Sequence, residues 1–439
     1  HGIEYSEGWG NDLLKSEGGW SLEIIDAAYP FSGSENWEYS INSRGGTPGT
    51  ANSVSASNID IRMPEVSAIF PSDNRTVNII FSEPVSGILE GGTDELIQNI
   101  AIEGIVKKDS LWRSYILKLA DSLAHGKIYT ALLGGVRDFA GNPLYNCCPD
   151  FGLTEQALPG DIVINEVLFD AIIPEEEYFE LYNSSGKILD IYDLQAVSLN
   201  LQSGDTGRPV LLSESSRCFL PGSYFAFTLS KESVLSRYYS SERTCIVEAP
   251  GMPVLYSDRG SLLLYSRSLS LIDEATYSKD FHFDLISGTK GVSLERIDPG
   301  EPGNIRYNWH SASGMVGWGT PGMVNSAAFN EENIESEDLV FSSSRISPDG
   351  DGFEDILKVS FNPGEGTSIV DVLIYSDSGI PVNRLISNYI AYGSSSFYWN
   401  GLDHYGNALP DGLYIVFVRS RGEAGRLKHW KKVCALVRY

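Results

Sequence analysis

The chain has 439 residues and a formal net charge of −26, and 42% of its residues are hydrophobic against 21% charged. Nucleic-acid affinity depends on cationic side chains that neutralise phosphates, so this acidity disfavours DNA or RNA as a partner. No run of about 18 apolar residues occurs, which excludes a membrane-spanning helix. The 44 glycines and 20 prolines suit short strands joined by tight turns.

A phrase near the N-terminus recurs late in the chain. Residues 19–53 and 291–326 share Ser-Leu-Glu-x-Ile-Asp, then Asn-Trp, then Gly-Thr-Pro-Gly and Asn-Ser, in the same order. Self-similarity of this kind predicts a duplicated structural unit. The second copy closes a segment that begins near Gly160, whereas the first copy has no such lead-in. We therefore expect the chain to begin inside a domain, as a truncated or processed product.

The first block, residues 1–53, is the shorter copy of this repeat. Apolar and polar side chains alternate over residues 20–24, which predicts a half-buried strand. The second block, residues 60–150, has strand-like segments about every ten residues, a spacing typical of a β-sandwich. Its phrases VNIIFSEPV (77–85) and RDFAGNPL (137–144) resemble the bacterial Ig-like domain of S-layer and other surface proteins. That resemblance implies a spacer without chemistry of its own.

The third block, residues 160–328, contains the complete repeat unit. Its phrases IVINEVLFD (162–170) and EYFELYNSSGKILDIYDLQ (177–195) resemble the lamin tail domain, an Ig-like β-sandwich. The later phrase RCFLPGSYFAFTLSKESV (217–234) and the Gly-Thr-Pro-Gly ending fit the bacterial secreted branch of that family. By the same resemblance, residues 1–53 are the C-terminal part of a second lamin-tail-like domain.

The fourth block, residues 340–439, resembles the Ig-like domain of the flagellar hook-capping protein and the C-terminal domains of gliding-motility and type IX secretion substrates. The phrases that carry this resemblance are SPDGDGFED (347–355) and YWNG (398–401). That family usually has Trp-Asp-Gly where this chain has Trp-Asn-Gly, which removes one carboxylate and puts a metal role at that turn in doubt. This order of four blocks is found in large secreted proteins of Bacteroidota-type bacteria. The predicted fold is therefore all-β, with tandem Ig-like β-sandwich domains and helix confined to short turns.

The sharpest group of potential metal ligands is Asp349, Asp351, Glu354 and Asp355. Carboxylates that alternate with glycine permit the tight wrapping that a hard cation such as calcium requires. The group is not an EF-hand, because the twelfth position counted from Asp349 is Ser360, where that loop needs a bidentate glutamate. The alternative is an Asp/Gly turn in which the aspartates bond to their own backbone.

Glu166 and Glu180 are the best candidates for a carboxylate pair. Both lie mid-strand in the opening of the third block, and Glu166 shares strand parity with apolar neighbours. A glutamate on an apolar face needs partners or a metal. One interpretation is a paired acid/base or calcium site; the other, which we favour, is strand glutamates that accept bonds from the backbone amides of a nearby loop.

Trp37, Trp309 and Trp399 each stand next to an asparagine and precede a turn. Exposed, they would be stacking platforms for sugars; buried, they would anchor sandwich cores, which we favour because large aromatic residues are usually buried. The duplication predicts that Trp37 and Trp309 occupy equivalent core positions. Cys218 and Cys245 would form a disulfide in an oxidising compartment and stay free thiols otherwise.

The sequence contains neither His-Glu-x-x-His nor Gly-x-Ser-x-Gly, and its six histidines are scattered. We therefore expect no catalytic or cofactor-binding residues. The predicted function is a non-catalytic scaffold, adhesion or adaptor protein at the cell surface, outer membrane or outside the cell. It would bind a protein partner at the outer membrane, as an accessory component of an export or assembly machine. The alternatives are a binding appendage of a larger secreted enzyme, such as a nuclease or glycan hydrolase, and a carbohydrate-binding module.

Overall fold

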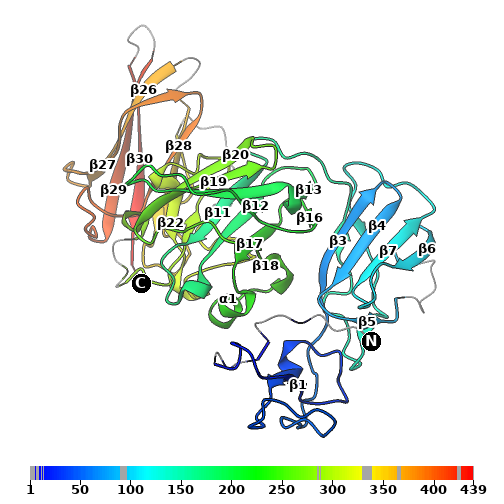
Figure 1. The fold of residues 1–439 in the computed structure, drawn as a ribbon. Coiled ribbons are helices and arrows are strands. Elements are labelled where there is room, and N and C mark those ends of the chain that lie inside the picture. Colours follow the sequence, from blue (N-terminus) through cyan, green and yellow to red (C-terminus); the bar gives the residue numbers. More distant parts are fainter. Residues whose placement is uncertain are drawn as a thin grey trace. The chain divides into compact units, whose positions relative to one another are not determined.

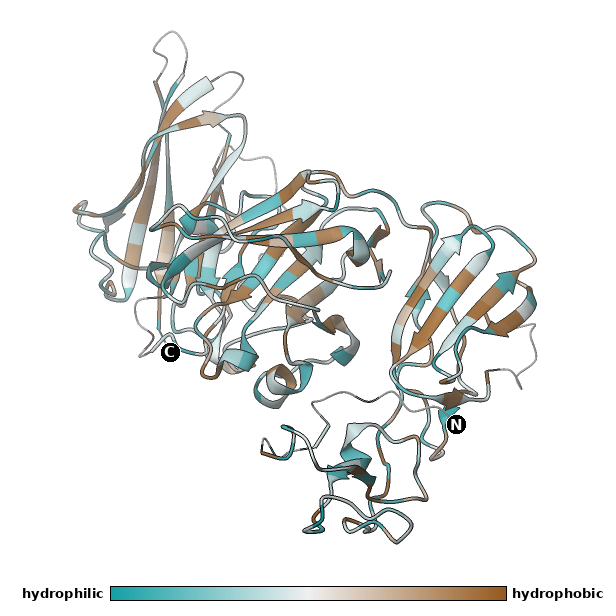
Figure 2. Cartoon of the chain, in the orientation of Figure 1, coloured by the Kyte–Doolittle hydropathy of each residue, from teal (hydrophilic) through white to brown (hydrophobic). Residues whose placement is uncertain are grey.

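Strands make up 41% of the structure, a computed structural model, and helices 7%. This confirms the all-β prediction. Among the described residues there is one α-helix, α1 (Lys231–Arg237), and the Ser230 hydroxyl caps its first turn by accepting the Ser233 N–H. Hydrophobic residues are concentrated along the strands (Figure 2). The structure describes residues 5, 9–10, 12, 14–88, 96–283, 286, 288–328, 339–362, 367–422 and 427–438.

The first of two compact units comprises residues 1–156, 186–192 and 214–221. Its largest sheet has four antiparallel strands in the order β3-β4-β7-β6 (Figure 1). In β7 every second side chain is buried, as expected of a strand with one face on a core. The strands of this sheet and its neighbours are β3 (Val66–Asp73), β4 (Thr76–Phe81), β5 (Val85–Ser86), β6 (Ile102–Lys107), β7 (Ser114–Leu119), β8 (Tyr129–Thr130), β9 (Arg137–Asp138) and β10 (Asp150–Phe151).

Two short segments from the third sequence block complete the core of this unit. They form the antiparallel pair β13 (Leu189–Asp190) and β16 (Cys218–Phe219). Ile188 and Cys218 belong to the same hydrophobic cluster as Phe151 of β10. The Cys218 thiol also donates to Gly152 O at 3.5 Å. The core of the first unit therefore includes side chains from beyond residue 150.

The second unit comprises residues 157–185, 193–213 and 222–439 and begins with a two-sheet sandwich. One sheet has six strands in the order β18-β17-β12-β11-β21-β22, and the other has four in the order β15-β14-β19-β20. Every residue of β11 is buried, because β11 lies in the middle of its sheet. The strands are β11 (Ile162–Leu168), β12 (Tyr178–Asn183), β14 (Leu194–Leu199), β15 (Val210–Leu211), β17 (Tyr224–Thr228), β18 (Ile246–Glu248), β19 (Arg259–Ser266), β20 (Leu271–Ser278), β21 (Leu294–Arg296) and β22 (Trp309–Ser311).

A second sandwich, drawn in orange to red in Figure 1, completes this unit. Its sheets have the orders β23-β25-β28 and β24-β30-β29-β26-β27. Asp298 of the preceding sandwich joins the two, since its Oδ2 accepts from Lys358 Nζ at 2.8 Å and from the Tyr398 hydroxyl at 3.2 Å. The strands are β23 (Leu339–Phe341), β24 (Arg345–Ile346), β25 (Leu357–Phe361), β26 (Thr367–Ser376), β27 (Pro381–Tyr392), β28 (Ser395–Trp399), β29 (Gly412–Gly422) and β30 (Leu427–Leu436).

The two copies of the repeated phrase form the same ladder. Glu23 lies opposite Glu38 in the first copy, and Glu295 lies opposite His310 in the second. In both copies a single turn of 3-10 helix precedes the tryptophan strand. The first ladder consists of β1 (Leu22–Ile24) and β2 (Trp37–Tyr39), and it corresponds to β21 and β22.

Side-chain hydrogen bonds are repeated as well. Asn36 Oδ1 accepts the Asp26 N–H at 2.9 Å, and Asn308 Oδ1 accepts the Asp298 N–H at 2.8 Å. These matching bonds show that the two copies share their local structure, as the repeated phrase predicts, but the equivalent core position expected of Trp37 is not found. The environments of the tryptophans differ, because Trp309 is 4% exposed, whereas the corresponding tryptophan of the first copy is only half-buried.

A buried ion pair connects the two sheets of the first sandwich in the second unit. Arg296 of β21 is 2% exposed, and its Nη1 lies 2.7 Å from Asp273 Oδ2 on β20. The same nitrogen donates to Ile164 O on β11, and Asp273 Oδ2 accepts the Ile164 N–H at 2.8 Å. Both charges are therefore held by partners on the opposite sheet.

We expect Arg296→Met to lower the free energy of unfolding by about 3 kcal/mol, because it leaves the Asp273 carboxylate, only 12% exposed, without its cation. The matched control is Lys279→Met in the same sandwich, which breaks an ion pair whose lysine is 41% exposed and should cost below about 1 kcal/mol. Urea unfolding followed by hydrogen exchange in β11 and β21 measures both. Equal costs for the two variants would contradict this account of the sandwich.

Candidate functional site

Three glutamates lie side by side in the middle of the six-stranded sheet. Glu166 on β11 is opposite Glu180 on β12 and also opposite Glu295 on β21. Residues opposite each other on neighbouring strands share one face of a sheet, so the three carboxylates point the same way. All three side chains are 0% exposed. We call Glu166, Glu180 and Glu295 the glutamate row.

A loop at residues 319–327, which begins Gly-Thr-Pro-Gly, lies on the glutamate row. This loop gives each carboxylate one backbone N–H, which compensates for the loss of water around a buried charge. The donors are Thr320 N to Glu166 Oε1 at 3.0 Å, Gly322 N to Glu180 Oε2 at 2.6 Å, and Ala327 N to Glu295 Oε2 at 2.8 Å.

Side chains complete the hydrogen bonding of the row. Glu166 Oε1 also accepts from the hydroxyls of Tyr178, at 2.7 Å, and Ser293. The Thr320 hydroxyl lies 3.2 Å from Glu166 Oε2 and 2.8 Å from Glu295 Oε1. A hydroxyl carries a single proton, so it can donate to only one of these carboxylates. A proton on the other carboxylate would complete the second bond.

Burial is the main cause of the pKa shifts in the row. It raises the pKa of Glu166 to about 7, and the neighbouring Glu295 carboxylate adds to the shift. Burial also raises the pKa of Glu295, and it raises that of Glu180 well above its usual value. The row can hold protons, but protein donors occupy its carboxylates and none of them is exposed. This geometry matches strand glutamates that accept bonds from a loop.

The corresponding glutamate of the first copy, Glu23, has the opposite electrostatics. It accepts from Thr47 Oγ1 at 2.6 Å and from Ser53 N and Oγ at 2.6 and 2.7 Å. Burial raises the pKa of Glu23, but these bonds and one from Ser40 outweigh it and lower the pKa to about 2. Among the described residues, no strand of the first copy corresponds to β11, so no carboxylate occupies the place of Glu166.

The sequence interpretation included Glu166 and Glu180 but missed Glu295. A signal for Glu295 was present, because it belongs to the repeated Ser-Leu-Glu phrase, as Glu23 does. The donors that bind these two glutamates are repeated too, with Thr47 and Thr320 in the Gly-Thr-Pro-Gly phrase. A glutamate repeated together with its hydrogen-bond donors indicates a conserved internal contact.

The predicted calcium ligands lie in the turn before β25, and the structure brings three of the four together. Oxygens of Asp349, Asp351 and Asp355 lie within 4.8 Å of one another. The Asp355 carboxylate accepts three backbone N–H groups, from Asp349 at 3.1 Å and from Gly350 and Gly352 at 2.8 Å each. These bonds are those of the alternative Asp/Gly turn, and calcium binding stays a prediction.

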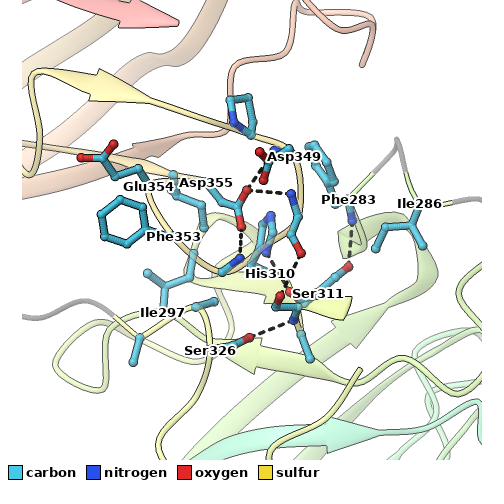
Figure 3. Close-up of a pocket in the computed structure, with 18 of the residues that line it drawn as sticks. Phe283, Ile286, Ile297, His310, Ser311, Ser326, Asp349, Phe353, Glu354 and Asp355 are labelled. Carbon is cyan, nitrogen blue, oxygen red and sulfur yellow. Dashed lines mark hydrogen bonds between the residues drawn. The ribbon is translucent and has the colours of Figure 1, made fainter. Parts of the chain in front are cut away.

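Glu354, the fourth predicted ligand, points away from Asp349 and Asp355 (Figure 3). Its carboxylate lies 2.5 Å from Arg345 Nε and 2.9 Å from the Ser343 hydroxyl. An arginine partner already neutralises this carboxylate. Any calcium site in the turn would therefore rest on the three aspartates.

The acidic turn borders a pocket of about 730 Å³ in the second unit (Figure 3). His310 lines it and is 8% exposed, with its Nδ1 2.8 Å from Ser311 O and its Nε2 without a hydrogen-bond partner. Burial lowers the pKa of His310 to about 4, so this imidazole is neutral at neutral pH. The aromatic rings of Phe283, Trp318 and Phe353 also line the pocket.

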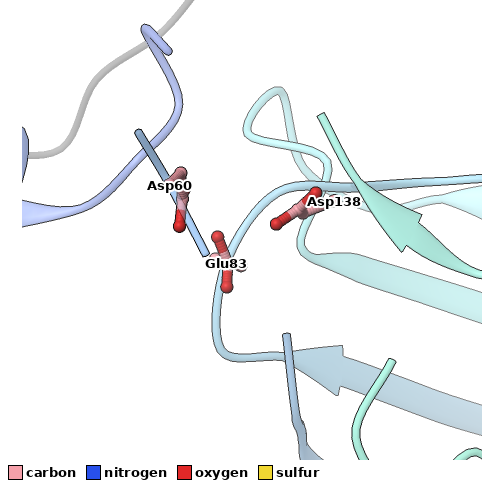
Figure 4. Close-up of side chains that lie close together, drawn as sticks. All are labelled: Asp60, Glu83 and Asp138. Carbon is pink, nitrogen blue, oxygen red and sulfur yellow. The ribbon is translucent and has the colours of Figure 1, made fainter. Parts of the chain in front are cut away.

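A second acidic group lies in the first unit. Carboxylates of Asp60, Glu83 and Asp138 converge (Figure 4), with oxygens within 4.8 Å of one another. Burial and the charges of the two aspartates raise the pKa of Glu83 to about 7. The Asp138 carboxylate is also bonded to the Asn142 N–H at 2.7 Å and side-chain amide at 2.8 Å. Sequence reasoning missed this group because its members are far apart in the chain.

The remaining candidates are aromatic residues and thiols. Trp309 and Trp399 are 4% and 1% exposed, which confirms their expected core positions and leaves neither ring free to stack on a sugar. Trp37 is half-buried and lies 6.1 Å from the Trp9 ring. No disulfide joins any of the five cysteines, all of which the structure describes, and this includes the two considered as a pair, Cys218 and Cys245.

Comparisons with known proteins do not place the chain in a family. No protein-family model matches it, and no curated protein matches it in sequence. Among solved structures, the N-terminal part of the bacterial S-layer protein SbsC aligns at 13% identity over 49% of this chain and 44% of that one, with a TM-score of 0.19.

Two proteins of Porphyromonas gingivalis also align. Dimeric latent PorU is 9% identical over 89% of this chain and 35% of its own, with a TM-score of 0.19. PorZ, a surface component of the type IX secretion system, is 11% identical over 92% of this chain and 63% of its own, with a TM-score of 0.17. The chain spans less than two thirds of each of these three proteins. TM-scores this low do not establish a shared arrangement of domains.

We expect Glu166→Gln to weaken the pH dependence of stability. A carboxyl with a pKa of about 7 in the folded state and an ordinary one of 4.5 takes up a proton on folding between these values. Stability therefore falls as pH rises through this window. The variant lacks this fall, so its unfolding free energy relative to wild type should improve by about 2 kcal/mol between pH 5 and pH 8.

Urea unfolding at several pH values checks this expectation. Glu242→Gln, at an exposed glutamate of the same unit, is the control and should follow the wild-type curve. Parallel curves for Glu166→Gln and wild type would show that the row does not take up a proton on folding.

If the three aspartates of the turn bind calcium, the ion should raise the melting temperature, because a ligand of the native state stabilises it by mass action. Calcium at about a hundred times its Kd would add about 2.7 kcal/mol. Asp351→Asn should abolish this gain, whereas Glu354→Gln should keep it, since Arg345 engages that carboxylate. Calorimetry with added calcium and with a chelator measures the melting temperature in each case. Identical melting temperatures would contradict calcium binding and support the Asp/Gly turn.

Proposed function

We propose that this chain is a non-catalytic component of a bacterial cell surface that binds another protein, as a scaffold or adaptor. The observation that carries the proposal is the free edge of the five-stranded sheet. β27 ends the strand order of this sheet and is 12 residues long. In the part of the chain that the structure describes, no further strand pairs with its outer edge.

Several side chains near the C-terminal end of this edge strand are apolar and exposed. Ile390 and Tyr392 of β27 are 68% and 84% exposed, and Ile369 of β26, opposite Ile390, is 41% exposed. A long apolar edge strand is a template for pairing with another chain, because its unpaired N–H and C=O groups give affinity and its side chains give specificity. This edge therefore suits a protein partner.

Binding also explains the chain better than catalysis does. The glutamate row is saturated by its own loop, and Asp355 is held by three backbone N–H groups. Neither is free to accept a proton from a substrate. The charge of −26 disfavours nucleic acid, and the sequence resemblances are to domains of surface and secreted proteins. These observations together support the proposed surface location and non-catalytic role.

A carbohydrate is a second candidate ligand, and one observation favours it. Trp318 and Phe353 line the 730 Å³ pocket and are 37% and 64% exposed, beside the carboxylates of the acidic turn. Aromatic faces next to polar groups suit a sugar ring. In this case the chain would act as a binding appendage of a larger secreted enzyme, and Phe353→Ala would abolish retention on a glycan array.

The decisive experiment captures surface proteins with the purified chain and with two variants. Ile390→Lys should lose the captured partner, because a charge on the edge strand opposes pairing. Leu413→Lys, at a 55% exposed position of β29, a strand with a neighbour on each side, should retain it. The identified partner is then purified, and its affinity for the three proteins is measured directly.

Assays for hydrolase, nuclease and glycosidase turnover accompany this experiment. Turnover that Glu166→Gln or Glu180→Gln abolishes would replace the proposal with an enzyme. If wild type and Ile390→Lys bind the partner equally well, the partner does not bind at the edge of β27.

A further inference from the structure

The ladder of the first copy has a free edge where the second copy has a strand. In the second unit β21 pairs with β22 on one side and with β11 on the other. In the first unit β1 pairs with β2, and among the described residues no strand lies on its other side. The second copy therefore shows what kind of strand this edge accepts.

The backbone of β1 is oriented for such a strand. The Ser21 N–H donates to Gly45 O at 2.8 Å, and the Ser21 C=O accepts the Ser40 N–H at 2.9 Å. In an antiparallel ladder alternate residues turn their backbone groups to opposite sides. The groups of Leu22 and Ile24 therefore face the free edge. In the second copy the corresponding residue Leu294 lies opposite Val167 of β11.

A carboxylate cradle accompanies this edge. In the second copy the Ser293 hydroxyl and the Thr320 N–H hold the Glu166 carboxylate of β11. Ser21 and Thr47 are their counterparts. The Ser21 hydroxyl lies 3.4 Å from Gly45 O, just as the Ser293 hydroxyl lies 3.4 Å from the corresponding carbonyl. Ser21 is exposed, so its hydroxyl is accessible to a glutamate on an incoming strand.

In the second copy, an asparagine next to the cradle, Asn325, exchanges hydrogen bonds with an asparagine of β11, Asn165. Asn325 donates to Arg296 O on β21 and to Asn165 O on β11, at 2.8 and 3.0 Å, and its Oδ1 accepts from Asn165 Nδ2 at 2.7 Å. Asn52 is the counterpart of Asn325 and makes the matching bond to Ile24 O at 2.9 Å. Asn52 is thus placed to bridge β1 to an asparagine on an incoming strand.

We propose that the free edge of β1 binds an extended segment of a second protein that carries Asn-Glu between apolar residues, as β11 does. The glutamate enters the cradle of Ser21 and Thr47, and the preceding asparagine pairs with Asn52. The apolar residues extend the ladder, in the manner of β-strand addition. This edge is separate from β27 and lies in the other unit, so the proposal goes beyond the function proposed above.

The probe is a fluorescent peptide of residues 161–169, DIVINEVLF, titrated with the full chain and followed by anisotropy. A scrambled peptide of the same composition is the reference. We expect saturable binding of the native peptide alone. The Asn165→Ala peptide should bind about fivefold more weakly through the loss of a neutral hydrogen bond, and the Glu166→Ala peptide about tenfold or more through the loss of a charged one.

Variants of the chain test the same contacts from the other side. Ser21→Ala should weaken binding of the native peptide about fivefold. The Glu166→Ala peptide lacks the carboxylate that Ser21 would hold, so it should bind Ser21→Ala and wild type with the same affinity. Ser55→Ala, at an exposed serine of the same unit, is the matched control and should bind as wild type does. Circular dichroism of both variants confirms folding, which an exposed serine does not govern.

Three results would overturn the proposal. The first is equal binding of the native and scrambled peptides, and the second is equal binding of the native and Glu166→Ala peptides. The third is a self-associated chain that excludes the peptide, because the occupant of the edge would then be a second copy of this chain. Ile390→Lys should leave peptide binding unchanged. Failure of the peptide to bind would therefore not contradict the proposal for β27. Failure of partner capture at β27 would likewise not contradict the proposal for the edge of β1.

Discussion

The hydrogen bonds between the 319–327 loop and the glutamate row are the constraint on which the first sandwich of the second unit depends. Three carboxylates side by side in a sheet repel one another, and burial removes the water that would stabilise them. Only the loop supplies a backbone donor to all three. Withdrawal of the loop would remove a backbone donor from each of three buried acids, so the loop stabilises the sheet that it covers.

This constraint reaches beyond the row itself. The loop begins directly after Trp318, which lines the pocket, and ends next to Ser326, whose hydroxyl accepts the Ser313 N–H. The Ser313 hydroxyl in turn donates to Gly350 O in the acidic turn, at 2.8 Å. The position of the acidic turn against the first sandwich therefore depends on a loop that buried carboxylates fix. In the first copy the same phrase holds one carboxylate, and its hydrogen bonds outweigh burial, so the pKa of Glu23 falls, whereas burial raises the pKa of Glu295.

Local patterns in the sequence predicted the all-β fold and the duplication. Alternating side chains and turn residues are short-range signals, and the repeated phrase specifies its own contacts, such as those of Asn36 and Asn308. Long-range convergence was not predictable in this way. Glu83 and Asp138 meet because β5, which follows Glu83, pairs with the distant strand β9, where Val85 lies opposite Asp138. Glu354 turns to Arg345 although it adjoins Asp355 in the sequence. The half-buried state of Trp37 likewise depends on which strands are present around it rather than on its own phrase.

The path of the chain between the two units has a consequence for proteolysis. The chain passes from one unit to the other five times, after residues 156, 185, 192, 213 and 221. One peptide-bond cleavage at any of these passages leaves the remaining four as covalent tethers. The two units are therefore joined by five covalent connections, whereas domains that follow one another along a chain are joined by one. A protease would have to cut at every passage before no covalent link joined the two units.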